Sequence, residues 1–258
     1  MDELVSIIMP SYNTGQFIGE SIKSVLSQTY DTWELIIVDD CSTDDTDAIV
    51  SSFSDSRIKY YKNNSNYGAA MSRNIALKRA HGKYVAFLDS DDLWHKDKLL
   101  KQVSFMRTNG FSFSYTDYEE INTNGDRTGV IVSGPKIITK SGMYNYCWPG
   151  CLTVMYDAFS IGLIEIKKIE KNNDYALWLE ICSKEKCHLL KEQLAFYRRG
   201  RVGSISSHKT KELIKWHYKV WRVCKNKNPF LSFVLTIRNL FFGIIKKIFY
   251  VKRVKNSQ

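Results

Sequence analysis

The first hundred residues repeat one pattern four times: a short apolar run, a polar run, and a segment whose apolar residues are spaced three or four apart. Apolar runs of this kind are typical of strands buried on both faces, as in a parallel sheet covered by helices. The strands are predicted at 4–9, 33–38, 57–61 and 84–88, and the helices between them at 16–28, 44–53 and 69–80. The alternation predicts an α/β fold with a Rossmann-like sheet flanked by helices.

Polar residues follow each of these predicted strands. Because parallel strands point the same way, their carboxyl ends meet at one edge of the sheet, where ligands bind in open α/β folds. The residues expected to converge there are Tyr12, Asp39, Asp40, Asn66, Arg73, Asp89 and Asp91. An aromatic ring can stack on a base, and a carboxylate can accept hydrogen bonds from a base or a ribose hydroxyl. This edge therefore predicts a nucleotide-diphosphate site.

The strand at 84–88 ends in three carboxylates within four residues, Asp89, Asp91 and Asp92. Like charges this close raise one another's pKa unless a cation lies among them. Hard oxygen ligands on a short loop suit Mg²⁺ or Mn²⁺, which share their coordination with water and substrate phosphates. The alternative is a solvated acidic turn that caps the next helix.

Beyond residue 110 the pattern is less regular. Strands are predicted at 111–118, 130–132 and 194–198, a turn at 122–126, and helices at 174–183, 211–225 and 230–251. We expect a domain of residues 1–208, with a nucleotide-sugar half (1–110) and a smaller acceptor half (111–208), followed by a basic amphipathic helical tail (209–258).

The net charge of +10 belongs to the tail. Residues 211–258 carry 12 Lys or Arg and one acidic residue, whereas the rest of the chain is almost neutral. This distribution argues against a nucleic-acid partner. A basic amphipathic stretch with Phe and Trp suits the surface of an anionic membrane. Its longest uncharged run, 228–237, is too short to span a bilayer, and a helix packed on the catalytic domain is the alternative.

The six cysteines show no CxxC pair and no metal-ligand spacing, and the first three residues lack the basic start of a secretory leader. We therefore expect reduced thiols and a cytoplasmic location. Cys151 has no evident partner His, so it is expected to be a core thiol rather than a nucleophile.

Five segments of the chain resemble glycosyltransferase family 2, whose members have the GT-A fold and use nucleotide-diphospho-sugars. The segments are 5–13, 24–30, 34–44, 66–74 and 88–92, in the order and at the spacing of the family. The chain has neither GxGxxG nor GxxxxGK[ST], which counts against a dinucleotide dehydrogenase and a P-loop NTPase.

The resemblance implies roles for residues at the predicted sheet edge. Pro10 and Tyr12 would flank uracil, and Asp40 would bind the edge of this base. Asp89 would contact the ribose side, and Asp91 would hold Mg²⁺ or Mn²⁺ with Asp89 as a second candidate ligand. The other donor-binding candidates are Asn13, Asp39, Asn66, Gly68, Arg73 and Ser90.

Asp174 is the candidate general base. An inverting transfer needs one carboxylate to take the proton of the acceptor hydroxyl. The family commonly shows Glu-Asp before an apolar helix here, and this chain has Asn173-Asp174. That pattern is similar to the teichuronic-acid-biosynthesis subgroup, as are residues 150–155 and 204–207. The alternative is a plain N-cap of the helix at 174–183.

Three arginines lie at the end of the strand at 194–198 and directly after it. Arg198, Arg199 and Arg201 would pair with the diphosphate, because a guanidinium matches two phosphate oxygens at once. Gly200 stands near the position where the family often has His, so a third metal ligand is doubtful there. A solvated basic loop is the alternative.

These features predict a metal-dependent inverting glycosyltransferase that moves a sugar from a UDP-sugar to a lipid-linked glycan acceptor in cell-surface polysaccharide synthesis. It would be a peripheral protein at the inner face of the cell membrane. Two alternatives stay open, a nucleotidyltransferase that forms sugar nucleotides and a non-catalytic membrane-surface binding protein. The first would need a Gly-rich loop with Arg or Lys after the first strand, where residues 10–13 read Pro-Ser-Tyr-Asn. Donor turnover would exclude the second.

Overall fold

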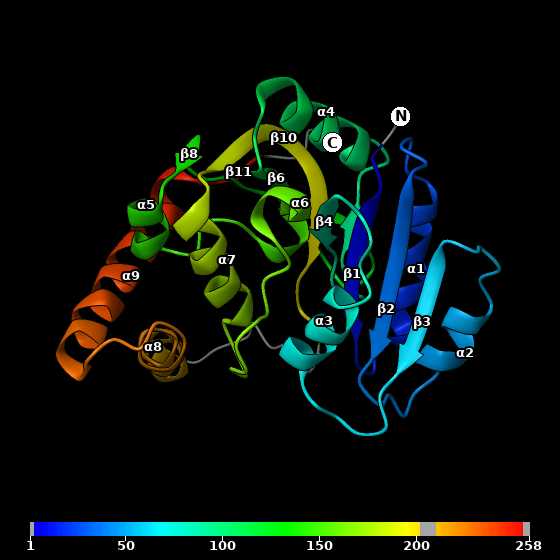
Figure 1. Ribbon diagram of the computed structural model, residues 1–258, viewed down its shortest axis with the longest axis horizontal. Coiled ribbons are helices and arrows are strands. Elements are labelled where there is room, and N and C mark those ends of the chain that lie inside the picture. The colour runs from blue at the N-terminus through cyan, green and yellow to red at the C-terminus, as the bar shows by residue number, and fades with distance from the viewer. Residues whose placement is uncertain (1–2, 202–209, 255–258) are drawn as a thin grey trace.

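Four parallel strands from the first half of the chain form one side of the sheet in the computed structural model, which describes residues 3–201 and 210–254. They are β1 (Val5–Ser11), β2 (Trp33–Asp39), β3 (Ile58–Lys62) and β4 (Tyr84–Phe87), in the spatial order β4-β1-β2-β3. The arrowheads of β2 and β3 point to one edge of the sheet (Figure 1). The predicted parallel sheet is confirmed.

Helices α1 (Gly15–Leu26) and α3 (Ala69–Leu77) cover opposite faces of these strands. Ile22 of α1 lies in one core cluster with Ile7, whereas Ala76 of α3 lies in the other with Ile8. Successive residues of β1 thus face opposite clusters, which is why its apolar run is unbroken. The shorter helix α2 (Thr46–Ser51) packs beside α1 (Figure 1).

The second half of the chain extends the sheet with mostly antiparallel strands. They are β5 (Leu93–Trp94), β6 (Phe113–Ile121), β7 (Arg127–Val132), β8 (Ile137–Ile138), β9 (Met155–Asp157) and β10 (Cys187–Arg198). β9 joins the halves, because it pairs with both β4 and β6. The predicted strand at 194–198 is only the last part of the long strand β10, which lies parallel to β6.

The connecting helices of this half are α4 (Lys98–Asn109), α5 (Lys140–Asn145), the 3-10 turn η1 (Cys151–Thr153), α6 (Ala158–Ile161) and α7 (Asn173–Lys184). α7 begins one residue before the predicted helix. Its Trp178 is fully buried and packs edge-on against Phe87 of β4, with ring centroids 5.2 Å apart. This contact fixes the start of α7 relative to the end of β4.

The tail contains α8 (Thr210–Lys219), a π-helical turn η2 (Val220–Cys224), α9 (Pro229–Phe249) and β11 (Val251–Arg253). α8 and α9 lie at the opposite end of the molecule from β2 and β3 (Figure 1). Trp216 and Trp221 are buried in the core, and β11 pairs antiparallel with β7 at the edge of the sheet. One side of the tail is therefore packed on the protein, while its division as a separate unit stays a prediction.

The fully buried positions of α9 are mostly polar, although Phe242 and Ile245 also pack, partly buried, against the core. Its buried residues are Ser232, Leu235, Thr236 and Asn239. The Asn239 amide donates to the carbonyls of Tyr144 at 2.9 Å and Asn145 at 2.8 Å. The exposed apolar side chains include Phe230, Phe233, Ile237, Phe241, Ile244, Ile248 and Phe249. The helix thus presents its apolar face outward.

By length and composition α9 is the one helix in the described part of the chain that could cross a membrane, with a mean hydropathy of 1.4. The expectation that this segment is too short holds for the uncharged run but not for the whole 21-residue helix. Arg238 interrupts the run, yet its Nε donates back to Asn145 Oδ1 at 2.6 Å. This contact holds the Arg238 guanidinium toward the protein.

Candidate active site

The loops after β1 and β2 are tied together at the carboxyl edge of the sheet. The Asn13 N–H donates to Ser42 Oγ at 2.8 Å, and the Thr43 N–H donates to Asn13 Oδ1 at 2.9 Å. Asn13 adopts a left-handed conformation, with φ of 48°, that asparagine tolerates well. Next to it Tyr12 is 46% exposed, whereas Pro10 is buried within β1. Tyr12 is thus the residue of this pair that can meet a ligand at the edge.

Asp39 and Asp40 are buried and shape the same loops. The Asp39 carboxylate accepts from the Ser42 N–H at 3.0 Å. The Asp40 carboxylate accepts from Asn63 Nδ2 at 2.9 Å and from the Gly68 N–H at 2.7 Å. The bonds to Asp40 hold the loop that carries the exposed Asn66, and the bond to Asp39 holds the loop after β2. Both acids thus have a positioning role in addition to their proposed contacts with the donor.

Gly68 meets a backbone requirement at the end of this loop. Its φ of 87° is a conformation that residues with a Cβ rarely adopt, and its N–H donates to the Asp40 carboxylate at 2.7 Å. Beside it Tyr67 is 50% exposed, and its N–H donates to Asp40 at 2.9 Å. Tyr67 is a further candidate contact. It lies within the matching segment 66–74 but was not among the predicted site residues.

Arg73 connects the donor half to the acceptor half. It is buried in α3, and its guanidinium forms an ion pair with Asp89 at the end of β4. Its other terminal nitrogen donates to Asn173 Oδ1 at 2.7 Å. Asn173 opens α7, where the family commonly has Glu, and the amide oxygen keeps an acceptor for Arg73. The arginine therefore brings Asp89 and the residue before Asp174 to one place.

Asp174 lies in the first turn of α7, in a partly buried position. Its Oδ1 accepts from the Tyr175 N–H at 2.8 Å. Burial raises the pKa of the Asp174 carboxyl above its usual value, and the charge of Arg73 opposes this shift. A carboxylate with a raised pKa is better suited to accept a proton from a hydroxyl group.

Asp91 and Asp92 differ sharply in environment. Asp92 is 1% exposed; its Oδ1 accepts from the Arg198 N–H at 2.8 Å, and its Oδ2 has no hydrogen-bond partner in the described structure. Burial raises the pKa of Asp92 well above its usual range, and Asp91 and Asp89 raise it further. Asp91 is less buried and lies 3.3 Å from the Nε of Arg201. Burial also raises the pKa of Asp91, and Arg201 opposes this shift.

The Asp91 carboxylate fits the role of metal ligand. It is 20% exposed, opens toward the sheet edge and already attracts one cation, the Arg201 guanidinium. Within residues 3–201 and 210–254, no group of three or more His, Cys, Asp or Glu is placed to hold a metal by itself. Mg²⁺ or Mn²⁺ at this loop would therefore be held by one or two carboxylates and would need substrate phosphates and water as its other ligands. Asp89 is the second candidate, although Arg73 pairs with one of its oxygens.

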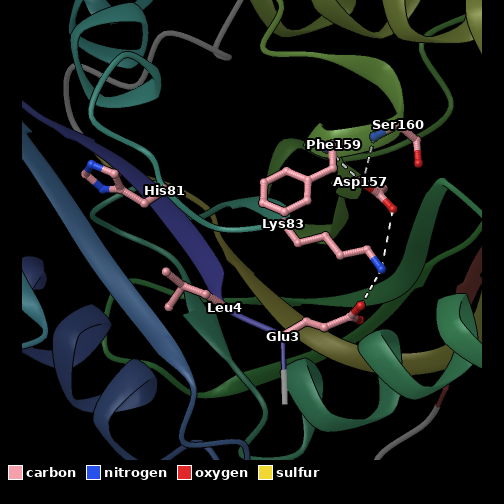
Figure 2. A pocket seen from close by; sticks show the side chains of 7 residues that line it. All are labelled: Glu3, Leu4, His81, Lys83, Asp157, Phe159 and Ser160. Atoms are coloured by element: carbon pink, nitrogen blue, oxygen red, sulfur yellow. Dashed lines mark hydrogen bonds and ion pairs between the residues drawn. The ribbon is translucent and has the colours of Figure 1, made fainter. Parts of the chain in front are cut away.

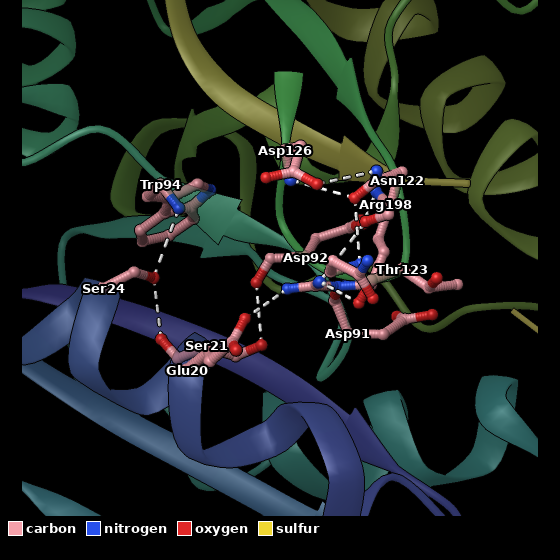
Figure 3. Close-up of polar contacts among 11 residues, drawn as sticks. Glu20, Ser21, Ser24, Asp91, Asp92, Trp94, Asn122, Thr123, Asp126 and Arg198 are labelled. Carbon is pink, nitrogen blue, oxygen red and sulfur yellow. Dashed lines mark hydrogen bonds and ion pairs between the residues drawn. The ribbon is translucent and has the colours of Figure 1, made fainter. Parts of the chain in front are cut away.

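Arg198 is a buried structural residue, as Figure 3 shows. Its Nε donates to the Asp91 carbonyl at 2.8 Å, and its terminal nitrogens donate to the Thr123 carbonyl at 2.9 Å and to Glu20 at 2.6 Å. The side chain has no exposed surface. Its guanidinium positions the backbone at Asp91, and direct pairing with a diphosphate stays a prediction that would require these contacts to break.

The remaining candidates lie around the same loop. Ser90 is buried between Asp89 and Asp91, and Arg199 is exposed and pairs with Glu120 at 2.8 Å. Burial raises the pKa of the Cys151 thiol well above its usual value, with Asp89 adding to the shift, so the group is a poor nucleophile, as expected. Residues 204–207, part of the subgroup pattern, lie outside the described residues.

A cavity of about 530 Å³ lies away from this edge. Leu4 and Lys83, which line it, directly precede β1 and β4, so the cavity is at the amino ends of these strands. Figure 2 shows Lys83 between Glu3 and Asp157, to which it is ion-paired. Because the polar candidate residues converge at the other edge, this cavity is not the donor site.

The fold and the site define a glycosyltransferase with the GT-A fold. The TarS fragment 1–349 of S. aureus in complex with UDP-GlcNAc has a TM-score of 0.71 with this chain at 21% identity, over 93% of this chain and 72% of that one. The mannosyltransferase PcManGT of Pyrobaculum calidifontis, in complex with GDP-Man and Mn²⁺, has a TM-score of 0.62 at 14% identity, over 95% of this chain and 76% of that one. These likenesses establish the fold.

The chain belongs to glycosyltransferase family 2, whose sequence model, "Glycosyl transferase family 2", matches residues 6–152. It is 42% identical to the UDP-Glc:alpha-D-GlcNAc-diphosphoundecaprenol beta-1,3-glucosyltransferase WfgD of Escherichia coli, over 98% of this chain and 99% of that protein. It is 43% identical to TuaG of Bacillus subtilis, named for teichuronic acid biosynthesis, over 81% and 83%. The family and subgroup resemblance is confirmed.

Proposed function

We propose that this glycosyltransferase moves one sugar, with inversion, from a UDP-sugar to a glycan that a diphosphate links to a polyprenyl lipid, in cell-surface polysaccharide synthesis. WfgD, which matches almost the whole chain, is named for a UDP-Glc donor and a diphosphoundecaprenol-linked acceptor. A second relative from Escherichia coli, WfaP, bears the same activity name and is 46% identical over 83% of this chain and 84% of that protein.

The observation that carries the proposal is the bridge made by Arg73. It holds Asp89 of the donor edge and Asn173 beside Asp174 at the same guanidinium. A donor bound along the carboxyl edge would therefore present its anomeric carbon toward the start of α7. This is the geometry that a base opposite a departing diphosphate requires.

Asp174 would accept the proton of the acceptor hydroxyl as that oxygen attacks the anomeric carbon. The new bond joins the acceptor oxygen to this carbon, and the bond from the carbon to the diphosphate oxygen breaks. The electron pair leaves with UDP, and the proton stays on Asp174. Asp91, assisted by Asp89, would hold Mg²⁺ or Mn²⁺, which neutralises charge on the leaving diphosphate.

The tail supports a location at the inner face of the cell membrane. The exposed face of α9 is apolar, with Phe233 58% and Phe241 59% exposed. Residues 211–258 of the tail also carry 12 Lys or Arg against one acid. An apolar face flanked by cations suits an anionic membrane surface, with each cation contributing about 1 kcal/mol near the surface. A lipid-linked acceptor is found at such a surface.

A transfer assay with a panel of UDP-sugars and a synthetic sugar-diphosphate-lipid acceptor tests this proposal. We expect UDP release with one donor, an acceptor heavier by one sugar residue in mass spectrometry, and loss of both when EDTA removes the metal. Formation of a sugar nucleotide from UTP and a sugar phosphate would instead indicate the nucleotidyltransferase alternative. Absence of turnover with every donor would favour the non-catalytic binding protein.

A further inference from the structure

A second cavity lies where the tail meets the sheet. It has a volume of about 420 Å³ and lies among β6, β7, α9 and β11. Its lining includes the cations Arg199, Lys246, Lys247 and Arg253, and Glu120 is the one acidic residue among the described residues that line it. Because Arg199 pairs with Glu120 at 2.8 Å, the positive charge of the other three is left uncompensated within the cavity.

Lys246 is the innermost of these cations. Its Nζ donates to the Trp148 carbonyl at 2.7 Å, and burial lowers the pKa of this amino group to about 8. Lys247 and Arg253 are exposed. An anion that enters the cavity would stabilise the positive charges of these three side chains. A diphosphate can accept hydrogen bonds from several such donors at once.

The cavity adjoins the acceptor side of the active site. On the same helix as Lys246, the Asn239 amide donates to the hydroxyl of Tyr175 at 3.1 Å, and Tyr175 directly follows Asp174 in α7. Tyr118 lines the cavity, and a Cβ on Gly150 would come within 3.1 Å of its ring. Gly150 leads into η1, which packs against β4, the strand that ends at the candidate donor site.

The apolar face of α9 begins beside these cations. Ile244 and Ile248, on either side of Lys247 in sequence, are 58% and 64% exposed, and Phe241 is 59% exposed. The spacing 241, 244, 248 places these three side chains in one stripe along the helix. A ligand with an anionic head and an apolar chain would find both complements on adjacent surfaces.

We propose that this cavity binds the diphosphate of a polyprenyl-diphosphate-linked acceptor and that the outer face of α9 receives the start of its prenyl chain. The inference rests on the proposed function and assigns the acceptor head group to named residues. The sugar would then extend past Tyr118 and Tyr146 toward Asp174.

Direct binding tests the assignment without catalysis. A short-chain alkyl diphosphate is titrated into protein saturated with UDP and Mn²⁺, which occupy the donor site, and the corresponding alkyl alcohol serves as the ligand control. We expect the alkyl diphosphate to bind, and the double variant Lys247→Ala/Arg253→Ala to bind it about 10- to 100-fold more weakly with unchanged affinity for UDP. The matched control Lys211→Ala/Lys215→Ala removes two exposed tail charges outside the cavity and should bind like the wild type.

Equal weakening by both double variants would assign the effect to the general charge of the tail, as for any anionic lipid surface, and would overturn the proposal. No weakening by the cavity variant would also overturn it. A transfer assay then separates this inference from the proposed function. The cavity variant should raise KM for the diphosphate acceptor and leave KM for a phosphate-free glycoside of the same sugar unchanged. If the wild type transfers sugar but the cavity variant shows no difference in KM between the two acceptors, the assignment of the cavity is refuted and the proposed function stands.

Discussion

Helices α1 and α9 are both amphipathic, yet α9 leaves a long row of apolar side chains exposed, whereas α1 packs its apolar face against the core. α1 buries Phe17, Ile22 and Val25, whereas α9 buries Ser232, Thr236 and Asn239 along with Leu235. Periodicity in the sequence gives a helix two faces, but it does not say which face the protein covers. The exposed apolar face of α9 is the feature behind its proposed contact with a membrane.

The two sides of the molecule therefore have different proposed roles. On the side of α1 the sheet edge holds the carboxylates that we propose carry the chemistry, and on the side of α9 lies the surface that we propose receives an acceptor with a lipid. Changes at the sheet edge should therefore affect transfer to every acceptor. Changes on the outer face of α9 should affect only what happens at a membrane.

The largest effect is expected from Asp91→Ala. Under the proposed function the diphosphate would lose its metal bridge, so transfer should fall by about 10³-fold or more with soluble and lipid-linked acceptors alike. Isothermal titration of UDP with and without Mn²⁺ should show that the metal no longer strengthens binding. Near-normal activity of Asp91→Asn without added metal would contradict the assignment.

Asp174→Asn should lower kcat by about 10²–10⁴-fold, the usual range for a general base, and leave UDP binding nearly unchanged. The wild-type rate should also fall as the pH drops through the raised pKa of Asp174, because only the deprotonated carboxylate accepts a proton. The acid limb of the kcat profile is therefore expected above the ordinary aspartate value of about 3.9. A matching loss of donor affinity would point to a donor-binding role instead.

A matched pair of substitutions sharpens the comparison of the two helices. Ile22 is fully buried in α1 and Ile244 is 58% exposed on α9. Ile22→Ala should lower the free energy of unfolding by about 2–5 kcal/mol, because it leaves a cavity in the core. Ile244→Ala should change it by less than about 0.5 kcal/mol. Urea unfolding of both variants measures the difference, and equal losses would mean that the outer face of α9 is covered by protein in solution.

The smallest effect is expected from Phe241→Ser on the outer face. Removing an aromatic side chain that inserts into the membrane should weaken binding to phosphatidylglycerol vesicles by about tenfold or somewhat more. UDP binding should not change. Vesicle sedimentation checks the prediction, with Tyr12→Ser, which alters an exposed aromatic residue at the donor edge, as the control that should sediment like the wild type.

The donor half was predictable because its signals are local. Each strand, its polar end and the next helix lie within about thirty residues, and parallel βαβ connections leave few topologies. The residues of the sheet edge thus follow from the sequence. Their partners do not, and the sequence gives no sign that Asp40 accepts from Asn63 and Gly68 rather than only from a ligand.

The acceptor half was harder because its contacts join distant segments. β10 contains Lys191 and Glu192, whose charges interrupt the apolar pattern expected of a strand. It pairs with β6, which lies more than seventy residues earlier in the chain. Arg198 was predicted at the end of a strand with a diphosphate as its partner, yet it donates to the carbonyls of Asn122 and Thr123. In the same way, the burial of Trp216 and Trp221 could not be read from the tail. Deletion of 209–258 would remove these two core residues, so point substitutions separate the roles of the tail more cleanly.

The configuration of the transferred sugar tests the central claim most directly. If Asp174 activates the acceptor hydroxyl opposite a diphosphate held at Asp91, a single displacement inverts the anomeric carbon. Proton NMR of the product formed from an α-linked UDP-sugar should then show a β-glycoside from the first turnover. A product that keeps the α configuration would contradict the account, because it would require an attack from the side of the leaving diphosphate or a covalent intermediate on the protein.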